Sequence, residues 1–370
     1  MRILWVVYGS LEQLSGGYLY DRLVVEYLRA HGVEVEVLGL RQPPYFLGPL
    51  RAVPRRLRSP LGFDAIVVDE LTHPSVFRWA VARAQTATPL LRPRLVTLVH
   101  HLRSREQVPP LLKAAARAME RRLLAASDAV IANSRATAAT VEELAGPLPL
   151  LAVCPPGCDR LPAAAKEAAH APGAAGEADG GLAAAGPAGP VRVLATGNLI
   201  PRKGYDLLLE LLAGMSGLPW ELRVAGRPVD RRYERRLHAL VRRWGLGDRV
   251  TFTGELSEKR LAEEYRRAEV FAFPSCYEGY GISLAEAVRA GLPFVAFTGG
   301  GVAEVVRGRG LLVPPGDLAG FGAHLRRLIA DSAFRERQAV LSRELAPALP
   351  TWRDTGRLFL AALKKACNCG

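Results

Sequence analysis

MRILWVVYGSLEQLSGGYLYDRLVVEYLRAHGVEVEVLGL, residues 1–40, contains two apolar runs separated by a glycine loop and an amphipathic segment. The run at 3–7 predicts a buried parallel strand, and apolar residues at helical spacing over 19–28 predict a helix. A second strand is expected at 33–38. Strand, helix and strand in this order form a βαβ unit with a right-handed crossover.

The same alternation continues along the rest of the chain. Further buried strands are expected at 65–68, 95–99 and 129–132, with helical stretches between them. After residue 190, strands are expected at 191–195, 221–224, 250–252, 270–273 and 294–296, and helices near 204–213, 231–244, 257–267, 282–290 and 318–330. This rhythm is typical of open doubly wound sheets, whose ligands bind at the carboxyl ends of the strands.

The stretch 162–190 interrupts this rhythm because it is nearly all alanine, glycine and proline. Such a segment cannot bury enough apolar surface to form a core, so it predicts a flexible linker. We therefore expect two α/β domains that face a central cleft. Their expected bounds are 1–160 for an N-terminal Rossmann-like domain, 161–190 for the linker, 191–350 for a second Rossmann-like domain, and 351–370 for a C-terminal helix and tail that cross back to the first domain.

Charge and apolar content restrict the class of protein. The 370 residues carry a formal net charge of +13, and basic residues gather in 41–60 and 92–122. Such basic stretches attract phosphates on nucleic acid, anionic lipid or a sugar nucleotide, or they form a solvated surface without a partner. No apolar run can cross a bilayer, and the N-terminal one is too short for a secretory signal, so we expect a cytoplasmic location.

The cysteines indicate neither a disulfide framework nor a metal centre. There are five, an odd and sparse set. The pairs Cys154 with Cys158 and Cys367 with Cys369 have spacings that suit zinc poorly. We therefore expect no metal.

The densest chemical signal is CYEGYGISLAEAVRAGLP, residues 276–293. A strand ends before it, and Gly281 allows the backbone to approach a ligand where the next helix begins. Amides at a helix N-terminus bind anions and suit a diphosphate; here they belong to Ile282, Ser283 and Leu284. Glu278 in the loop and Glu286 in the helix can line one crevice and accept hydrogen bonds from sugar hydroxyls.

The pattern Glu278-x7-Glu286 followed by Gly291-Leu-Pro293 resembles the retaining glycosyltransferases of family 4, which have the GT-B fold. Further matches to that family follow in order along the chain: Gly16-Gly17, His100-His101-Leu102, Asn133-Ser134-Arg135, PPGCD at 155–159, GNLIPRKG at 197–204, GGGVAE at 299–304, GLLVPPGD at 310–317, and the helix that starts near Trp352. The resemblance covers the chain apart from 162–190.

The resemblance implies transfer of a hexose from a nucleotide-diphosphate sugar, with retention of anomeric configuration and without a required metal or cofactor. It implies that Glu286 holds the ribose hydroxyls and that Glu278 holds the donor sugar. Lys203, with Arg202 beside it, would neutralise the diphosphate leaving group. No carboxylate nucleophile stands out for a double displacement. The resemblance implies reaction on one face of the sugar, with the leaving phosphate assisting proton removal.

The N-terminal half would contribute to the same donor site. Gly16 and Gly17 are expected to let their loop close over the phosphates. His100, in preference to His101, is expected to approach the donor sugar. One departure concerns Asn198, where many family members have arginine. We hypothesise that Arg202 supplies the missing positive charge, because arginine can fork onto two phosphate oxygens.

Other functions remain open at this point. A sugar-nucleotide epimerase of similar architecture, a non-catalytic sugar-nucleotide-binding module and a nucleic-acid-binding module are alternatives. Basic and aromatic residues are not interleaved as in nucleic-acid-binding segments, so no nucleic acid is expected. Three acceptor classes stay open: a lipid, a glycan and a small molecule. We hypothesise that the stretch 41–60 contacts an anionic membrane, which would make the protein peripheral.

Overall fold

The computed structural model describes residues 1–13, 15–50, 52–58, 60, 62–85, 92–106, 108–161 and 189–368. By their contacts these residues form two compact units. The first unit consists of Met1–Gly157, Glu278–Ile282 and Pro350–Gly370, and the second of Cys158–Tyr277 and Ser283–Leu349. The linker expected at 161–190 falls, from 162 to 188, outside the described residues.

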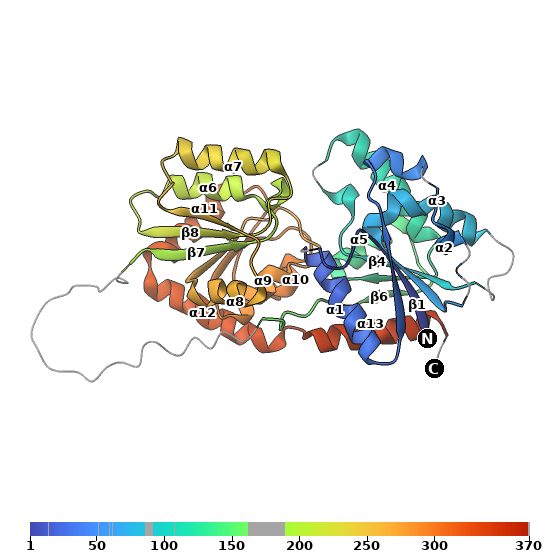
Figure 1. Ribbon diagram of the computed structural model, residues 1–370. Coiled ribbons are helices and arrows are strands. Elements are labelled where there is room, and N and C mark those ends of the chain that lie inside the picture. The colour runs from blue at the N-terminus through green and yellow to red at the C-terminus, as the bar shows by residue number, and fades with distance from the viewer. Residues whose placement is uncertain are drawn as a thin grey trace, which may run out of the picture. The chain divides into compact units, whose positions relative to one another are not determined.

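The first unit contains a parallel sheet in the order β2-β1-β3-β4-β5-β6 (Figure 1). Its strands are β1 (Arg2–Tyr8), β2 (Glu34–Leu40), β3 (Ala65–Asp69), β4 (Arg94–Val99), β5 (Ala129–Ala132) and β6 (Leu151–Val153). Its helices are α1 (Gly16–Ala30), α2 (Arg55–Arg58), α3 (His73–Ala84), α4 (Pro110–Ala125), α5 (Arg135–Ala145) and α13 (Trp352–Ala366), with short 3-10 turns η1 (Tyr45–Leu50), η2 (Glu70–Thr72) and η4 (Arg103–Arg105).

Both faces of this sheet are covered by helices, as its apolar central strands require. Successive side chains of a strand point to opposite faces. Trp5 of β1 accordingly packs in the cluster that includes α1 and α13, whereas Val6 packs with α3 and α4 (Figure 1). The C-terminal helix α13 therefore belongs to the first unit, where Phe359 stacks on Trp5 with ring centroids 5.4 Å apart.

The second unit contains a parallel sheet in the order β12-β11-β10-β7-β8-β9 (Figure 1). Its strands are β7 (Val191–Thr196), β8 (Trp220–Ala225), β9 (Val250–Gly254), β10 (Val270–Phe273), β11 (Phe294–Phe297) and β12 (Leu311–Val313). Its helices are α6 (Tyr205–Ala213), α7 (Arg231–Arg243), α8 (Glu258–Arg267), α9 (Ile282–Arg289, whose first residue groups with the first unit), α10 (Val302–Val305), α11 (Leu318–Ala330) and α12 (Ser332–Leu345), with 3-10 turns η5 (Pro201–Lys203) and η6 (Ala346–Ala348).

The predicted fold class of two Rossmann-like α/β domains is confirmed, and each expected strand is present. The strands β6 and β12 were not predicted, because each is only three residues long and lies at the edge of its sheet. Helix α12 was also missed. In the described parts of the chain, no helix is both long enough and apolar enough to traverse a bilayer.

Candidate functional site

Helix α9 begins directly after Gly281, beyond the carboxyl end of β10. Gly281 has a φ of 104°, which a residue with a side chain rarely adopts. The amides of the first turn have no intrahelical partner and carry the positive end of the helix dipole. They belong to Ile282, Ser283 and Leu284, and the Leu284 side chain itself is fully buried. Only the backbone of Leu284 can therefore face a ligand.

The carboxylate of Glu286 is buried and held from two sides within the second unit. Arg160 Nε donates to Glu286 Oε1 over 2.6 Å. The Tyr265 hydroxyl donates to Glu286 Oε2 over 3.0 Å, and the Thr196 hydroxyl lies 3.0 Å from the Tyr265 oxygen. Burial, and then the charge of Glu286, raise the pKa of Tyr265 well above its usual value, so this hydroxyl keeps its proton.

Neither Arg160 nor Tyr265 was predicted from the sequence. Arg160 also lies 3.4 Å from the more exposed Glu258. The sequence signal that could have indicated Arg160 is its position directly after PPGCD at 155–159, one of the stretches that match the family. Tyr265 gives no such signal, since one tyrosine on an amphipathic helix is most often a core residue.

Lys203 and Arg202 lie in η5, at the carboxyl end of β7. Lys203 crosses the backbone of Gly197, where a Cβ atom would come within 2.9 Å of Lys203 Cε. Gly197 therefore leaves room for the lysine chain, whose Nζ lies 5.5 Å from the centre of the Phe273 ring. The Arg202 guanidinium donates to the carbonyl of Tyr277. The half-buried Asn198 follows Gly197 directly.

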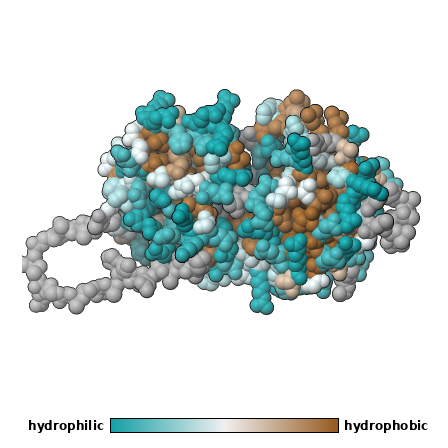
Figure 2. Space-filling view, viewed as in Figure 1, coloured by the Kyte–Doolittle hydropathy of each residue, from teal (hydrophilic) through white to brown (hydrophobic). Residues whose placement is uncertain are grey.

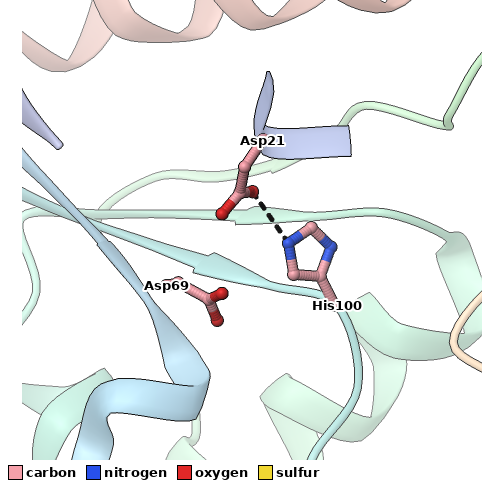
Figure 3. Close-up of side chains that lie close together, drawn as sticks. All are labelled: Asp21, Asp69 and His100. Carbon is pink, nitrogen blue, oxygen red and sulfur yellow. Dashed lines mark hydrogen bonds and ion pairs between the residues drawn. The ribbon is translucent and has the colours of Figure 1, made fainter. Parts of the chain in front are cut away.

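A buried polar cluster surrounds His100 at the carboxyl ends of β3 and β4 in the first unit. His100 Nε2 lies 2.9 Å from Asp21 Oδ1, and Figure 3 shows the Asp69 carboxylate beside this pair. The main-chain amide of His100 donates to Glu70 Oε2 over 3.0 Å. Gly17 leaves space for the ring, because a Cβ atom there would lie 3.1 Å from His100 Cδ2.

The charges of this cluster depend on one another. Burial, together with the charge of Asp21, raises the pKa of Asp69 to about 7. Burial, and then the charge of Asp69, raise the pKa of Glu70 well above its usual value. Burial alone would lower the pKa of His100, but the charge of Asp21 and the hydrogen bond to it outweigh burial and raise that pKa.

The loop that carries Glu278 contacts the first unit, to which its residues 278–282 belong. The Ser134 hydroxyl donates to the carbonyl of Gly279 over 2.6 Å and also caps α5 by accepting from Thr137 N. A Cβ atom on Gly279 would lie 1.7 Å from His100 O, so only glycine fits there. Ser134 is thus both a helix cap and a loop contact, and Glu278 is buried.

The predicted site residues divide between the two units. The first unit holds Gly16, Gly17, His100, Glu278, Gly281 and Ile282, and the second holds Asn198, Arg202, Lys203, Ser283, Leu284 and Glu286. In the first unit, Gly17 lies against His100, and a Cβ atom on Gly16 would be 3.6 Å from Ile282 Cδ1. The second histidine, His101, instead pairs with Glu106 over 2.7 Å.

Asp21, Asp69 and His100 offer ligand atoms within 4.8 Å of one another, the spacing of a metal site. The geometry favours a different interpretation. His100 Nε2 lies 2.9 Å from Asp21 Oδ1, the distance of a direct hydrogen bond between the ring and the carboxylate. We interpret the cluster as a hydrogen-bonded acid–imidazole pair with a neighbouring acid.

Comparison with known proteins places the chain in a family. Residues 19–160 match "Glycosyltransferase Family 4" and residues 185–344 match "Glycosyl transferases group 1". The chain therefore belongs to the family 4 glycosyltransferases, as its motifs predicted.

The relatives include D-inositol 3-phosphate glycosyltransferase of Xylanimonas cellulosilytica, which is 34% identical over 236 residues covering 60% of this chain and 54% of the relative. Mannosylfructose-phosphate synthase of Agrobacterium fabrum is 30% identical over 181 residues, covering 46% of this chain and 40% of the relative. The matched part of the chain thus spans about half the length of these relatives.

Solved structures of similar fold cover nearly the whole chain. Sucrose-phosphate synthase from Thermosynechococcus elongatus matches with a TM-score of 0.76 and 22% identity, over 100% of both chains. Anabaena HepE in complex with UDP-glucose matches with a TM-score of 0.72 and 21% identity, over 99% of this chain and 100% of that one. The GT-B architecture expected from the motifs is thereby confirmed.

Proposed function

We propose that this chain transfers a hexose from a nucleotide-diphosphate sugar to an acceptor with retention of anomeric configuration. The observation that carries the proposal is the buried Glu286 carboxylate, which is held in place by hydrogen bonds from Arg160 and Tyr265. Glu286 lies in α9, and the amides in the first turn of that helix have no intrahelical partner. A carboxylate accepts hydrogen bonds from a ribose diol, and helix N-terminal amides bind phosphates. HepE, which shares the fold, binds UDP-glucose.

The second unit would hold the nucleotide. We assign the ribose to Glu286 and the diphosphate to Lys203. The amides of Ser283 and Leu284 and the backbone beside Asn198 complete the proposed diphosphate site. Lys203 is positioned by the space that Gly197 leaves, so its side chain can lie across the end of β7. Positive charge there stabilises the diphosphate as it leaves.

The Arg202 guanidinium supports the Tyr277 carbonyl, immediately before Glu278. We retain it as the proposed second cation at the diphosphate. In this role Arg202 would supply the positive charge that is missing at Asn198, and it would also hold the loop that carries Glu278.

The first unit would contribute the groups that face the sugar. Glu278 and His100 are buried, and the Gly279 backbone lies against His100 O, so the two residues lie in neighbouring segments of the first unit. Gly16 and Gly17 supply backbone without side-chain bulk beside them. We propose reaction on one face of the sugar, in which positioning and charge supply most of the rate enhancement. The groups named act without a metal or cofactor.

A thermal-shift screen tests donor binding. A panel that includes UDP-glucose and GDP-mannose is expected to contain a donor that raises the Tm of the wild-type chain, because a ligand that binds only the folded state stabilises it. Lys203→Ala should weaken that shift, whereas Lys259→Ala, an exposed lysine of α8, should leave it unchanged. Equal shifts for wild type and Lys203→Ala would remove Lys203 from the site.

We further propose that the acceptor side contacts an anionic membrane surface. Phe46, Leu47 and Leu50 of η1 are 54%, 51% and 74% exposed, and Leu111 of α4 is 76% exposed. Both η1 and α4 pack against α3 in the first unit. Figure 2 shows hydrophobic residues among hydrophilic ones on this part of the unit. Exposed arginines accompany them, including Arg55 and Arg58 of α2 and Arg117 and Arg121 of α4.

Not every basic residue of the two stretches is available for a lipid. Arg56 donates to Glu36 through two nitrogens, over 2.8 and 2.6 Å. Arg92 and Arg94 both lie near Asp128. Among the described residues, the surface that combines exposed apolar and basic side chains includes η1, α2 and the exposed side of α4.

Sedimentation with phosphatidylglycerol vesicles at low salt tests the membrane proposal. Wild type is expected to pellet, and Leu50→Asp should reduce the pelleted fraction several-fold because it places a charge among the inserted side chains. Val229→Asp, at a residue 50% exposed in the second unit, serves as the matched control. Wild-type protein that stays in the supernatant would discard the proposal and favour a small-molecule or glycan acceptor.

A further inference from the structure

Helix α1 supplies three neighbours of the His100 ring. Asp21 meets Nε2, the Tyr20 ring packs edge-on at 5.1 Å between centroids, and Gly17 leaves room for Cδ2. Asp21 is completely buried and His100 is 5% exposed. The imidazole therefore cannot rotate freely, and water does not compete for the Asp21 carboxylate.

The two ring nitrogens have different surroundings. Nε2 is engaged by Asp21, whereas Figure 3 shows Nδ1 directed away from both Asp21 and Asp69. In a neutral imidazole only one nitrogen carries the proton, and the hydrogen bond of one nitrogen decides the state of the other. A carboxylate at Nε2 can accept but not donate while it is ionised, so the proton belongs on Nε2.

We propose that Asp21 is a positioning residue that fixes the Nε2–H form of His100 and presents Nδ1 as the atom that meets the substrate. The inference deepens the proposed function and rests on it for the role of His100 toward the donor sugar. In the neutral ring, Nδ1 accepts a hydrogen bond from a sugar or acceptor hydroxyl. In the charged ring, Nδ1–H donates to an oxygen that gains negative charge.

The neighbouring acids, Asp69 and Glu70, lie close to the Asp21–His100 pair but do not take the place of Asp21 at the ring. Asp69 of β3 faces His100 with a raised pKa, and Glu70 accepts from the main chain of His100, not from its ring. Asp21 is thus the acid that is hydrogen-bonded to the imidazole. Because the Asp21 charge favours the imidazolium, its removal should lower the pKa of His100.

Histidine NMR tests the positioning role without any substrate. The chain has seven histidines, and the His100 signals can be assigned by their loss in His100→Gln. In wild type the neutral ring should show the Nε2–H form. Asp21→Asn should lower the pKa of His100, and Asp21→Ala should also yield a mixture of tautomers. Glu26→Gln, an exposed acid of the same helix, should change neither.

Kinetics with the donor then separate positioning from binding. For release of nucleotide diphosphate from UDP-glucose or GDP-mannose, Asp21→Ala should lower kcat about 10- to 100-fold with little change in KM, because an orienting partner acts on the reacting geometry. Asp21→Asn should retain more activity than Asp21→Ala, and it serves as the folded variant should the alanine variant not fold.

An unaltered His100 titration and tautomer in Asp21→Asn would overturn the inference. So would wild-type kcat in Asp21→Ala alongside a strongly impaired His100→Gln. If wild type cleaves neither nucleotide sugar, the proposed function fails with these donors, and the NMR comparison still decides whether Asp21 controls His100.

Discussion

At the scale of single residues, the candidate site depends on charged groups that are buried in pairs. Glu286 is 4% exposed and accepts hydrogen bonds from Arg160 and Tyr265. A buried carboxylate without partners would be strongly unfavourable, and these two groups provide one partner for each Glu286 oxygen. These hydrogen bonds hold the Glu286 carboxylate in place as an acceptor. They also use part of the hydrogen-bonding capacity of each oxygen before any ligand binds.

Arg160→Ala tests this pairing through stability. The substitution leaves Glu286 with fewer partners, so the free energy of unfolding should fall by roughly 1–3 kcal/mol, as for lost hydrogen bonds to charged groups. In urea denaturation, the double variant Arg160→Ala/Glu286→Gln should lose less than the sum of the single losses. Arg235→Ala, at an exposed position on α7, is the control. Additive losses would show that the two residues do not interact.

Residue identity was predictable where a motif fixed it, and unpredictable where only the fold created the contact. Glu278, Glu286, Lys203 and His100 could be named in advance because their spacing matches a family pattern. Asp21 could not, since it lies 79 positions from His100 and meets it only when α1 packs on the sheet. Such contacts leave no periodic signal in one sequence.

At the scale of elements, the two sheets were predicted well because their central strands are buried on both faces. All seven residues of β1 except Arg2 are buried, which gives the continuous apolar run that marks a parallel strand. Edge strands such as β6 and β12 lack this signature. The terminal helix α13 is specified by a capping box between Thr351 and Asp354 and by an apolar face that includes Phe359.

Phe359→Ala tests the docking of α13. Phe359 is fully buried against Trp5 and Tyr20, so its truncation should reduce the free energy of unfolding of the first unit by about 3–5 kcal/mol. Leu358 is 38% exposed on the same helix, and Leu358→Ala should cost much less. Urea denaturation of the two variants gives the comparison. Similar losses for both would mean that α13 does not dock through Phe359.

At the scale of the whole molecule, each unit supplies a different part of the proposed chemistry. The second unit carries the groups suited to a nucleotide diphosphate, and the first carries the His100 cluster, the loop at 278–282 and the surface proposed to face a membrane. Membership of the family 4 glycosyltransferases explains why both sets of groups occur in one chain.

The most direct measurement follows the glycosyl–phosphate bond of a nucleotide sugar by phosphorus NMR. Wild-type protein incubated with UDP-glucose or GDP-mannose is expected to release the nucleotide diphosphate from at least one of them, slowly without an acceptor. Glu278→Gln should release it at a much lower rate, while the exposed-site variant Glu255→Gln matches wild type. Intact donors after prolonged incubation with wild type, together with no detectable binding of either, would contradict the assignment of this chain as an active hexosyltransferase that uses them.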